Sequence, residues 1–189
     1  MSKVLVPLAR GFEEIEAVTI IDVLRRAEVE VLVASLNEQD FIKGANGIVI
    51  QTDVKVKDIS VDAIDMIVLP GGWEGTYALA DDKYVQSLLK EMDAKGKNIA
   101  AICAAPFALN KAGVLKKNYT CYPSVEEEIR VEGYMGDKSM VVEDANIMTS
   151  RGPATAICFA LAIVKKLKGE ETYKNVKSGL LADFCEKLV

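Results

Sequence analysis

The sequence predicts an α/β protein with a mostly parallel central sheet that helices cover on both faces. Short apolar runs rich in Val, Ile and Leu alternate along the chain with segments whose apolar residues recur at helical spacing. This alternation is typical of βαβ units. The chain has 189 residues, of which 50% are hydrophobic and 27% charged, so we expect one globular domain over residues 1–189.

The first predicted strand covers residues 3–8, with the sequence KVLVPL. Pro7 conflicts with this assignment, because proline removes a donor from the ladder and favours an edge strand. The rest of the run is strand-like, so we keep the strand and place Pro7 near its end.

A helix is predicted next, over residues 14–27, because Ile20 and Leu24 continue one apolar face at i, i+4 spacing. A second strand follows at 30–35, with the sequence EVLVAS. The segment 42–56 contains two glycines and an asparagine before a β-rich run, which predicts a small hairpin.

The middle of the chain continues the alternation. Residues 65–69, DMIVL, form a buried type of strand that ends at Pro-Gly-Gly. A helix over 81–95 follows, with Asp81 or Asp82 as its N-terminal cap. Residues 98–102, NIAAI, form the next strand.

The last predicted elements alternate in the same way. A short helix over 105–112 carries Pro106 in its first turn, where proline is tolerated. Two short strands are predicted at 140–142 and 146–149, and a helix with one apolar face at 154–168.

Composition excludes several classes of function. The chain has no histidine, which removes Ser-His-Asp and Cys-His arrangements within one chain and zinc sites that need imidazole. A general base must therefore be Glu, Asp, Lys, Tyr or a thiolate. Its 23 basic and 28 acidic residues give a formal net charge of −5 without a basic run, which argues against nucleic acid and anionic membranes.

The four cysteines, at positions 103, 121, 158 and 185, form no CxxC pair. The sequence also has neither a signal-peptide pattern nor an apolar run of about 18 residues that could span a membrane. We therefore expect a cytoplasmic protein with free thiols. Cys158 lies beside the apolar face of its predicted helix, which indicates a core position.

Ligands of open parallel sheets bind beyond the carboxyl ends of the strands, and three strand ends here carry unusual residues, after positions 8, 69 and 102. Cys103 lies between a strand and a helix, which is the geometry of a nucleophile elbow, and a helix N-terminus lowers the pKa of a thiol. The alternative is a buried, inert cysteine. Gly71 and Gly72 let the backbone approach a ligand closely, although an ordinary tight turn is the alternative.

Three glutamates gather where the first predicted helix begins. A helix N-terminus favours carboxylates by about 0.3–1 kcal/mol, which accounts for Glu13 and Glu14. Glu16 lies inside the first turn, close to the strand end. In a chain without histidine, it is a natural proton-transfer partner for Cys103.

The chain resembles the ThiJ/PfpI superfamily, and within it the branch of the Parkinson-disease-associated protein deglycases and their bacterial relatives. The resemblance runs from residue 3 to about 169 and rests on four stretches in the family's order: VLVPLARGFEEIEAVTIIDVLRRA, DMIVLPGGWEG, AAICAAP and TSRGPATAICFALAIVKKL. It implies a flavodoxin-like three-layer sandwich with a mostly parallel central sheet, and a homodimer.

The resemblance also assigns roles to residues of this chain. The family's reactive cysteine falls on Cys103 and its active-site glutamate on Glu16. The backbone N–H groups that face the oxyanion fall on Gly72 and Ala104. The family's SRGP loop brings Arg151 to the pocket.

Three positions depart from the family's pattern. Tyr122 stands where some members have a histidine, and we expect it to line the pocket or donate a hydrogen bond. Ala104 stands where the peptidase-like branch has histidine, which argues against protease and amidotransferase activity. Asn46 replaces a hairpin arginine of some members, which argues against an anion site shared across the dimer.

The resemblance implies a cysteine-dependent enzyme without cofactor or metal. Its substrates would be 2-oxoaldehydes such as methylglyoxal, as a glyoxalase, or their early adducts on glycated proteins, as a deglycase. Cys103 would be the nucleophile and Glu16 the general acid/base. The alternative is a redox sensor or redox-linked chaperone that responds to oxidative stress through Cys103. A catalytically inactive paralogue is a third possibility, which the presence of both residues disfavours.

Overall fold

The computed structural model describes residues 2–187, with side chains up to Cys185. Its centre is a seven-stranded sheet in the order β5-β2-β1-β6-β7-β9-β8, in which only β8 runs antiparallel to its neighbour. The predicted α/β class and mostly parallel sheet are therefore confirmed. The strands are β1 (Lys3–Leu8), β2 (Glu30–Ser35), β5 (Val54–Lys55), β6 (Met66–Leu69), β7 (Asn98–Ile102), β8 (Val141–Asp144) and β9 (Ile147–Ser150).

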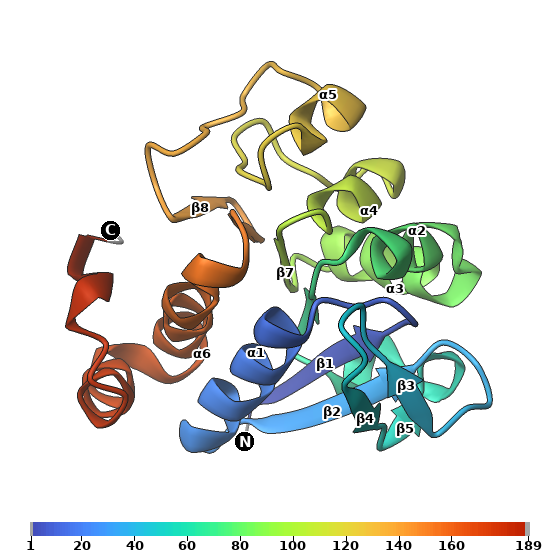
Figure 1. The fold of residues 1–189 in the computed structure, drawn as a ribbon, viewed down its shortest axis with the longest axis horizontal. Helices are drawn as coiled ribbons and strands as arrows, with labels where there is room; N and C mark the ends of the chain where they lie inside the picture. The colour runs from blue at the N-terminus through green and yellow to red at the C-terminus, as the bar shows by residue number, and fades with distance from the viewer. Residues whose placement is uncertain (1, 188–189) are drawn as a thin grey trace.

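Helices cover both faces of this sheet (Figure 1). One apolar core lies under α1 (Glu14–Arg26) and α6 (Ala156–Gly179). A second core, on the opposite face, lies under α2 (Trp73–Asp81), α3 (Lys83–Ala94) and α4 (Pro106–Lys111). The remaining helical segments are α5 (Val125–Ile129) and the 3-10 turns η1 (Val56–Asp58), η2 (Val61–Ala63), η3 (Pro153–Thr155) and η4 (Asp183–Lys187).

Pro7 lies in β1 near the centre of the sheet, close to the end of the strand as predicted. The Lys3 carbonyl accepts a hydrogen bond from the N–H of Asp65, the residue before β6. Every second residue of a strand directs its backbone groups to the same side, so the backbone of Pro7 also faces β6. Pairing between β1 and β6 extends only to Leu5. The ladder between β1 and β6 therefore ends before Pro7, which has no N–H to donate.

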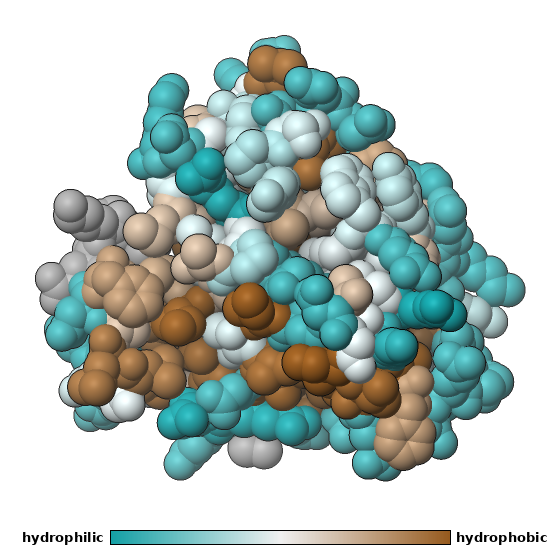
Figure 2. Space-filling view, in the orientation of Figure 1, coloured by the Kyte–Doolittle hydropathy of each residue, from teal (hydrophilic) through white to brown (hydrophobic). Residues whose placement is uncertain are grey.

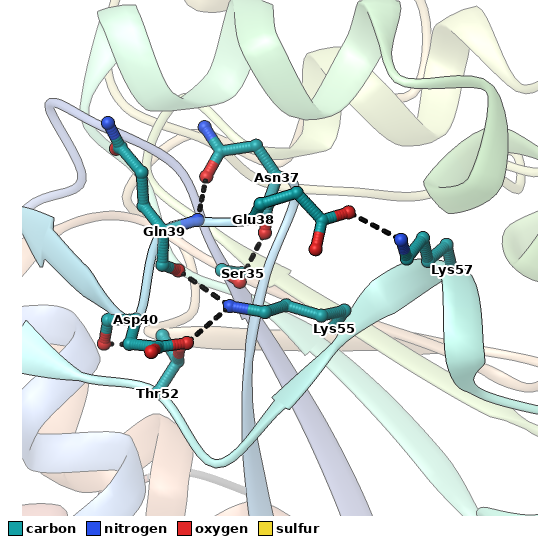
Figure 3. Close-up of polar contacts among 8 residues, drawn as sticks. All are labelled: Ser35, Asn37, Glu38, Gln39, Asp40, Thr52, Lys55 and Lys57. Atoms are coloured by element: carbon teal, nitrogen blue, oxygen red, sulfur yellow. Dashed lines mark hydrogen bonds and ion pairs between the residues drawn. The ribbon is translucent and has the colours of Figure 1, made fainter.

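The predicted hairpin is present as β3 (Phe41–Lys43) and β4 (Val49–Gln51), an antiparallel pair outside the main sheet. Figure 3 shows how the loop before it is tied to the edge strand β5. Lys55 donates to Asp40 at 2.6 Å and to the Gln39 carbonyl at 3.0 Å, and Lys57 pairs with Glu38. Charged side chains on an edge strand oppose pairing with other chains.

Two helical predictions needed correction. The segment predicted as one helix over 81–95 is α3 alone, capped by Asp82, whose carboxylate accepts from the N–H groups of Tyr84 and Val85. The preceding helix α2 was not predicted, because Gly72 and Gly75 near its start indicate a turn. The last helix was predicted to end at 168, but α6 kinks at Gly169 and then continues as a helix to Gly179.

No helix within residues 2–187 is long and apolar enough to cross a membrane.

The expectation of four free thiols is wrong. Cys158 on α6 and Cys185 on η4 form a disulfide, with their Cα atoms 5.3 Å apart, and both residues are buried. The chain turns back after α6 and returns Cys185 to a residue 27 positions earlier. Cys103 and Cys121 remain free and buried.

Candidate active site

The candidate site lies at the carboxyl ends of β1, β6 and β7. Among the five central strands the order β2-β1-β6-β7-β9 reverses direction between β1 and β6. Loops that leave this point diverge to opposite faces of the sheet, here to α1 and α2, and such switch points are where ligands of open α/β sheets bind. The loop that leaves β7 adds Cys103 to the same edge.

Cys103 has the backbone conformation of a nucleophile elbow. Its φ is +65°, in the left-handed region that a residue with a side chain seldom adopts. Two hydrogen bonds hold the strained peptide: the Cys103 N–H donates to the Ser150 carbonyl at 3.1 Å, and its own carbonyl accepts from the Tyr122 N–H at 2.9 Å. The side chain retains 9% exposure at the top of the sheet.

Glu16 is fully buried in the first turn of α1. Glu13 caps this helix by accepting from the Glu16 N–H at 2.8 Å, so the dipole role expected for Glu13 takes the form of a cap. The Oε2 atom of Glu16 accepts from the Gly71 N–H at 2.7 Å. Its Oε1 atom is buried without a hydrogen-bond partner, which is costly for a carboxylate.

Gly71 brings the thiol and the carboxyl group together. A Cβ atom on Gly71 would lie 2.7 Å from Oε2 of Glu16 and 3.1 Å from the sulfur of Cys103. The carboxyl group and the thiol therefore both lie directly beside the Gly71 backbone. Gly72 has a φ of +89°, and a Cβ there would lie 2.3 Å from the Gly11 carbonyl oxygen. Only glycine lets this loop pass so close to the loop after β1.

The environment changes the proton affinity of both groups. Burial raises the pKa of Glu16 to about 7 from an ordinary 4.5, against the opposing effect of the Gly71 N–H and the Cys103 thiol. Burial first, and then the charge of Glu16, raise the pKa of Cys103. The N–H groups of Gly72 and Ala104, which face the sulfur, lower this pKa only in part. We expected a helix N-terminus to lower the pKa of Cys103, and this expectation is wrong, because the pKa is raised.

Glu14 has a role that sequence reasoning missed. Its buried carboxylate accepts from the backbone N–H of Asn46 at 2.6 Å, from the Asn46 side-chain amide at 3.0 Å and from the Ile48 N–H at 3.3 Å. Glu14 thus fixes the turn of the β3–β4 hairpin against the start of α1. No local pattern distinguishes it from Glu13, because its partners lie more than 30 positions away.

The two pocket residues predicted from the family lie together. Tyr122 and Arg151 line one cavity of about 250 Å³ with Pro123 and the start of η3. The Nε atom of Arg151 is buried there without a hydrogen-bond partner. This cavity adjoins the elbow, because the Tyr122 N–H donates to the Cys103 carbonyl.

The model of the DJ-1/PfpI family matches residues 2–166. The chain belongs to this family. Protein dj-1beta of Drosophila melanogaster is 43% identical over 187 residues, which cover 97% of this chain and 100% of that relative.

Two further comparisons bear on fold and activity. The crystal structure of Drosophila melanogaster DJ-1beta superposes with a TM-score of 0.91 and covers 96% of this chain and 98% of that one, which confirms the flavodoxin-like sandwich expected for a DJ-1/PfpI protein. A Caenorhabditis elegans relative named glutathione-independent glyoxalase DJR-1.2 is 38% identical, over 84% of both chains. The family thus includes a protein named as an enzyme.

Proposed function

We propose that this DJ-1/PfpI protein is a cofactor-independent glyoxalase that converts 2-oxoaldehydes such as methylglyoxal into 2-hydroxy acids. The proposal rests on one observation above all. A buried carboxyl group with a pKa of about 7 lies beside a thiol that two backbone N–H groups face. A pKa near the working pH suits a group that must both take and give protons.

The first step forms a carbon–sulfur bond. The sulfur of Cys103 adds to the aldehyde carbon while the thiol proton passes to ionised Glu16, which gives a hemithioacetal. The carbonyl electron pair moves to oxygen, and the N–H groups of Gly72 and Ala104 stabilise the oxyanion. Glu16 then returns its proton to this oxygen, which completes the hemithioacetal and leaves Glu16 ionised for the next step. The raised pKa of Cys103 fits this step, because the thiol keeps its proton until Glu16 accepts it.

The second step moves a proton between two carbons. Glu16 removes the proton from the former aldehyde carbon and returns one to the neighbouring carbon, which turns the hemithioacetal into a thioester of the hydroxy acid. Water then cleaves the carbon–sulfur bond and releases lactate from methylglyoxal. No external oxidant or reductant is needed, because one carbon is oxidised while its neighbour is reduced. With an early adduct on a glycated protein, the same site would release the amine, as a deglycase.

The decisive experiment is a lactate assay on methylglyoxal with Cys103→Ala and Cys121→Ala beside the parent protein. We expect Cys103→Ala to abolish turnover and Cys121→Ala to retain it. Both residues are buried free thiols, so the second variant controls for the loss of a cysteine. Turnover that survives in Cys103→Ala would overturn the proposal.

The site also favours a second function, as a redox sensor or redox-linked chaperone under oxidative stress. A carboxyl group with a pKa of about 7 is protonated often enough at neutral pH to donate to a sulfinate on Cys103. Sustained methylglyoxal turnover at catalytic protein concentration argues for the enzyme. Stoichiometric oxidation without turnover argues for the sensor.

We further propose that the protein works as a homodimer. Figure 2 shows apolar side chains gathered over α1 and the β3–β4 hairpin. The patch includes Ile15, Val18, Ile48 and Val49, which are 45–58% exposed. A second copy of the chain would cover this surface. Light scattering tests the state, and a mass near 20.6 kDa for the parent protein would overturn the dimer.

A further inference from the structure

The chain's single tryptophan follows a residue of the candidate site directly in the sequence. Trp73 is the first residue of α2 and directly follows Gly72, whose N–H faces the sulfur of Cys103. Its side chain is 40% exposed, which is high for so large an apolar ring. The mechanism proposed above makes no use of it.

Trp73 belongs to a row of three rings that joins the two helices beside the elbow. It stacks on Tyr77, one turn later in α2, with the centroids 5.3 Å apart and an interplanar angle of 23°. Tyr77 in turn forms a T-shaped pair with Phe107, with the ring centroids 5.5 Å apart. Phe107 lies in the first turn of α4, and its N–H donates to the Ala104 carbonyl. The row therefore begins and ends close in sequence to the two residues whose N–H groups face Cys103.

We propose that Trp73 selects 2-oxoaldehydes with an aromatic substituent, by stacking against that ring. This inference rests on the glyoxalase function proposed above and names its preferred substrate class. Tyr77 and Phe107 act as support, because they hold the indole in place and reduce the entropy lost when a second ring stacks on it.

Only one side of the site leaves room for a large substituent on a 2-oxoaldehyde bound at Cys103. Gly71 and buried Glu16 close the inner side around Cys103, so a group larger than methyl must extend toward the surface. Toward the surface, Trp73 directly follows Gly72, and the cavity of Tyr122 and Arg151 adjoins Cys103 through the hydrogen bond from the Tyr122 N–H to the Cys103 carbonyl. Trp73 offers an exposed ring that Tyr77 and Phe107 support, so we assign the aromatic substituent to this side.

Binding can be measured without turnover, because Trp73 is the only source of tryptophan fluorescence. Cys103→Ala protein is titrated with mandelate, the product expected from phenylglyoxal, and with lactate, the product from methylglyoxal. We expect saturable quenching by mandelate and none by lactate at equal concentration. Linear quenching by mandelate, as for free tryptophan in solution, would overturn the proposal.

Kinetics supply the second test, through the ratio of kcat/KM for phenylglyoxal to kcat/KM for methylglyoxal. Trp73→Ala should lower this ratio about three- to tenfold, chiefly through a higher KM for phenylglyoxal. Trp73→Phe, which keeps a ring, should restore most of it. Tyr84→Ala is the matched control, because Tyr84 is similarly exposed but lies beyond the far end of α2.

The outcomes separate the two proposals. An unchanged ratio in Trp73→Ala, an equal loss in Tyr84→Ala, or a larger loss in Tyr122→Ala would overturn the role of Trp73. Absence of turnover with either aldehyde in the parent protein would overturn the glyoxalase function. In that case the mandelate titration still decides whether Trp73 binds aromatic acids.

Discussion

The molecule contains two buried thiols beside carboxyl groups, and they differ in almost every other respect. The thiol of Cys103 and the carboxyl group of Glu16 both lie beside Gly71. The sulfur of Cys121 lies 4.0 Å from a carboxylate oxygen of Glu126. Burial is the largest influence on both thiols, and it raises the pKa of Cys121 to about 12. A thiol next to a carboxyl group is therefore not by itself a reactive centre.

Three features separate the two sites. Cys103 has a strained φ of +65°, whereas Cys121 is not among the positive-φ residues of the described chain. The N–H groups of Gly72 and Ala104 face the sulfur of Cys103. Cys103 keeps 9% exposure and Cys121 none. Strain, donors and access together give the Cys103 site the features of a catalytic centre.

The carboxyl groups differ as well. Glu16 is fully buried with one unpartnered oxygen, and its pKa is raised to about 7. Glu126 is partly exposed, on the short helix α5. The interior penalises the charge of Glu16.

The largest expected effect is on turnover. Glu16→Gln keeps the shape of the side chain but removes the titratable proton, so methylglyoxal turnover should fall about 10²–10⁴-fold. In the parent protein, kcat/KM should rise with pH through about 7, because Glu16 must be ionised to accept the thiol proton. Lactate release across a pH series measures both, and the rise should be absent in the variant.

Glu126→Gln is the matched control for turnover, since it alters the carboxyl group beside the other thiol. Turnover should stay within about twofold of the parent value, because no proton transfer depends on Glu126. A loss as large as that in Glu16→Gln would remove the distinction between the two sites.

The second effect is on stability, and its sign follows from the raised pKa. The folded state binds the Glu16 proton more tightly than the unfolded state, so stability is lost as pH rises from about 4.5 through about 7. A shift from 4.5 to about 7 corresponds to about 3 kcal/mol. Glu16→Gln should therefore be more stable than the parent at pH 8.5, with the advantage shrinking toward pH 4.5.

Urea unfolding at several pH values measures this difference. The alternative role of Glu16, as a helix-dipole carboxylate, requires a loss of stability of at most about 1 kcal/mol on its removal. Destabilisation of Glu16→Gln at pH 8.5 would contradict the buried, unpartnered carboxylate.

The third effect concerns the close approach at Gly71. Gly71→Ala would place a Cβ atom 2.6 Å from Cβ of Cys103, which should cost about 1–3 kcal/mol and reduce turnover by moving the pair apart. Gly152→Ala is the comparison, because its Cβ would lie 3.2 Å from the exposed Tyr122 ring, which can move. Denaturant midpoints of both variants should rank Gly71→Ala as the less stable.

The smallest effect is on alkylation. Both free thiols have raised pKa values, so access decides the order, and iodoacetamide should modify Cys103 before Cys121. Cys158 and Cys185 should react only after reduction, because they form a disulfide. Peptide mass spectrometry with and without a reductant gives the order. Prior modification of Cys121 would reverse the comparison.

The sequence by itself determined the alternation of strands and helices and the residues that stand where the strands end. Apolar periodicity is a local property, so the strands predicted at 3–8, 30–35 and 98–102 have the same bounds in the fold. The absence of histidine likewise narrows the candidate bases through composition alone.

Only the tertiary structure decided which of these residues interact and in which protonation state. Glu16 meets the Gly71 N–H across 55 positions, Glu14 meets Asn46 across 32, and Cys158 meets Cys185 across 27. Burial raises the pKa of Glu16, and burial is created by elements distant in the sequence. A pattern of neighbours along the chain carries no record of such contacts, because desolvation and hydrogen bonding depend on what surrounds a group in space.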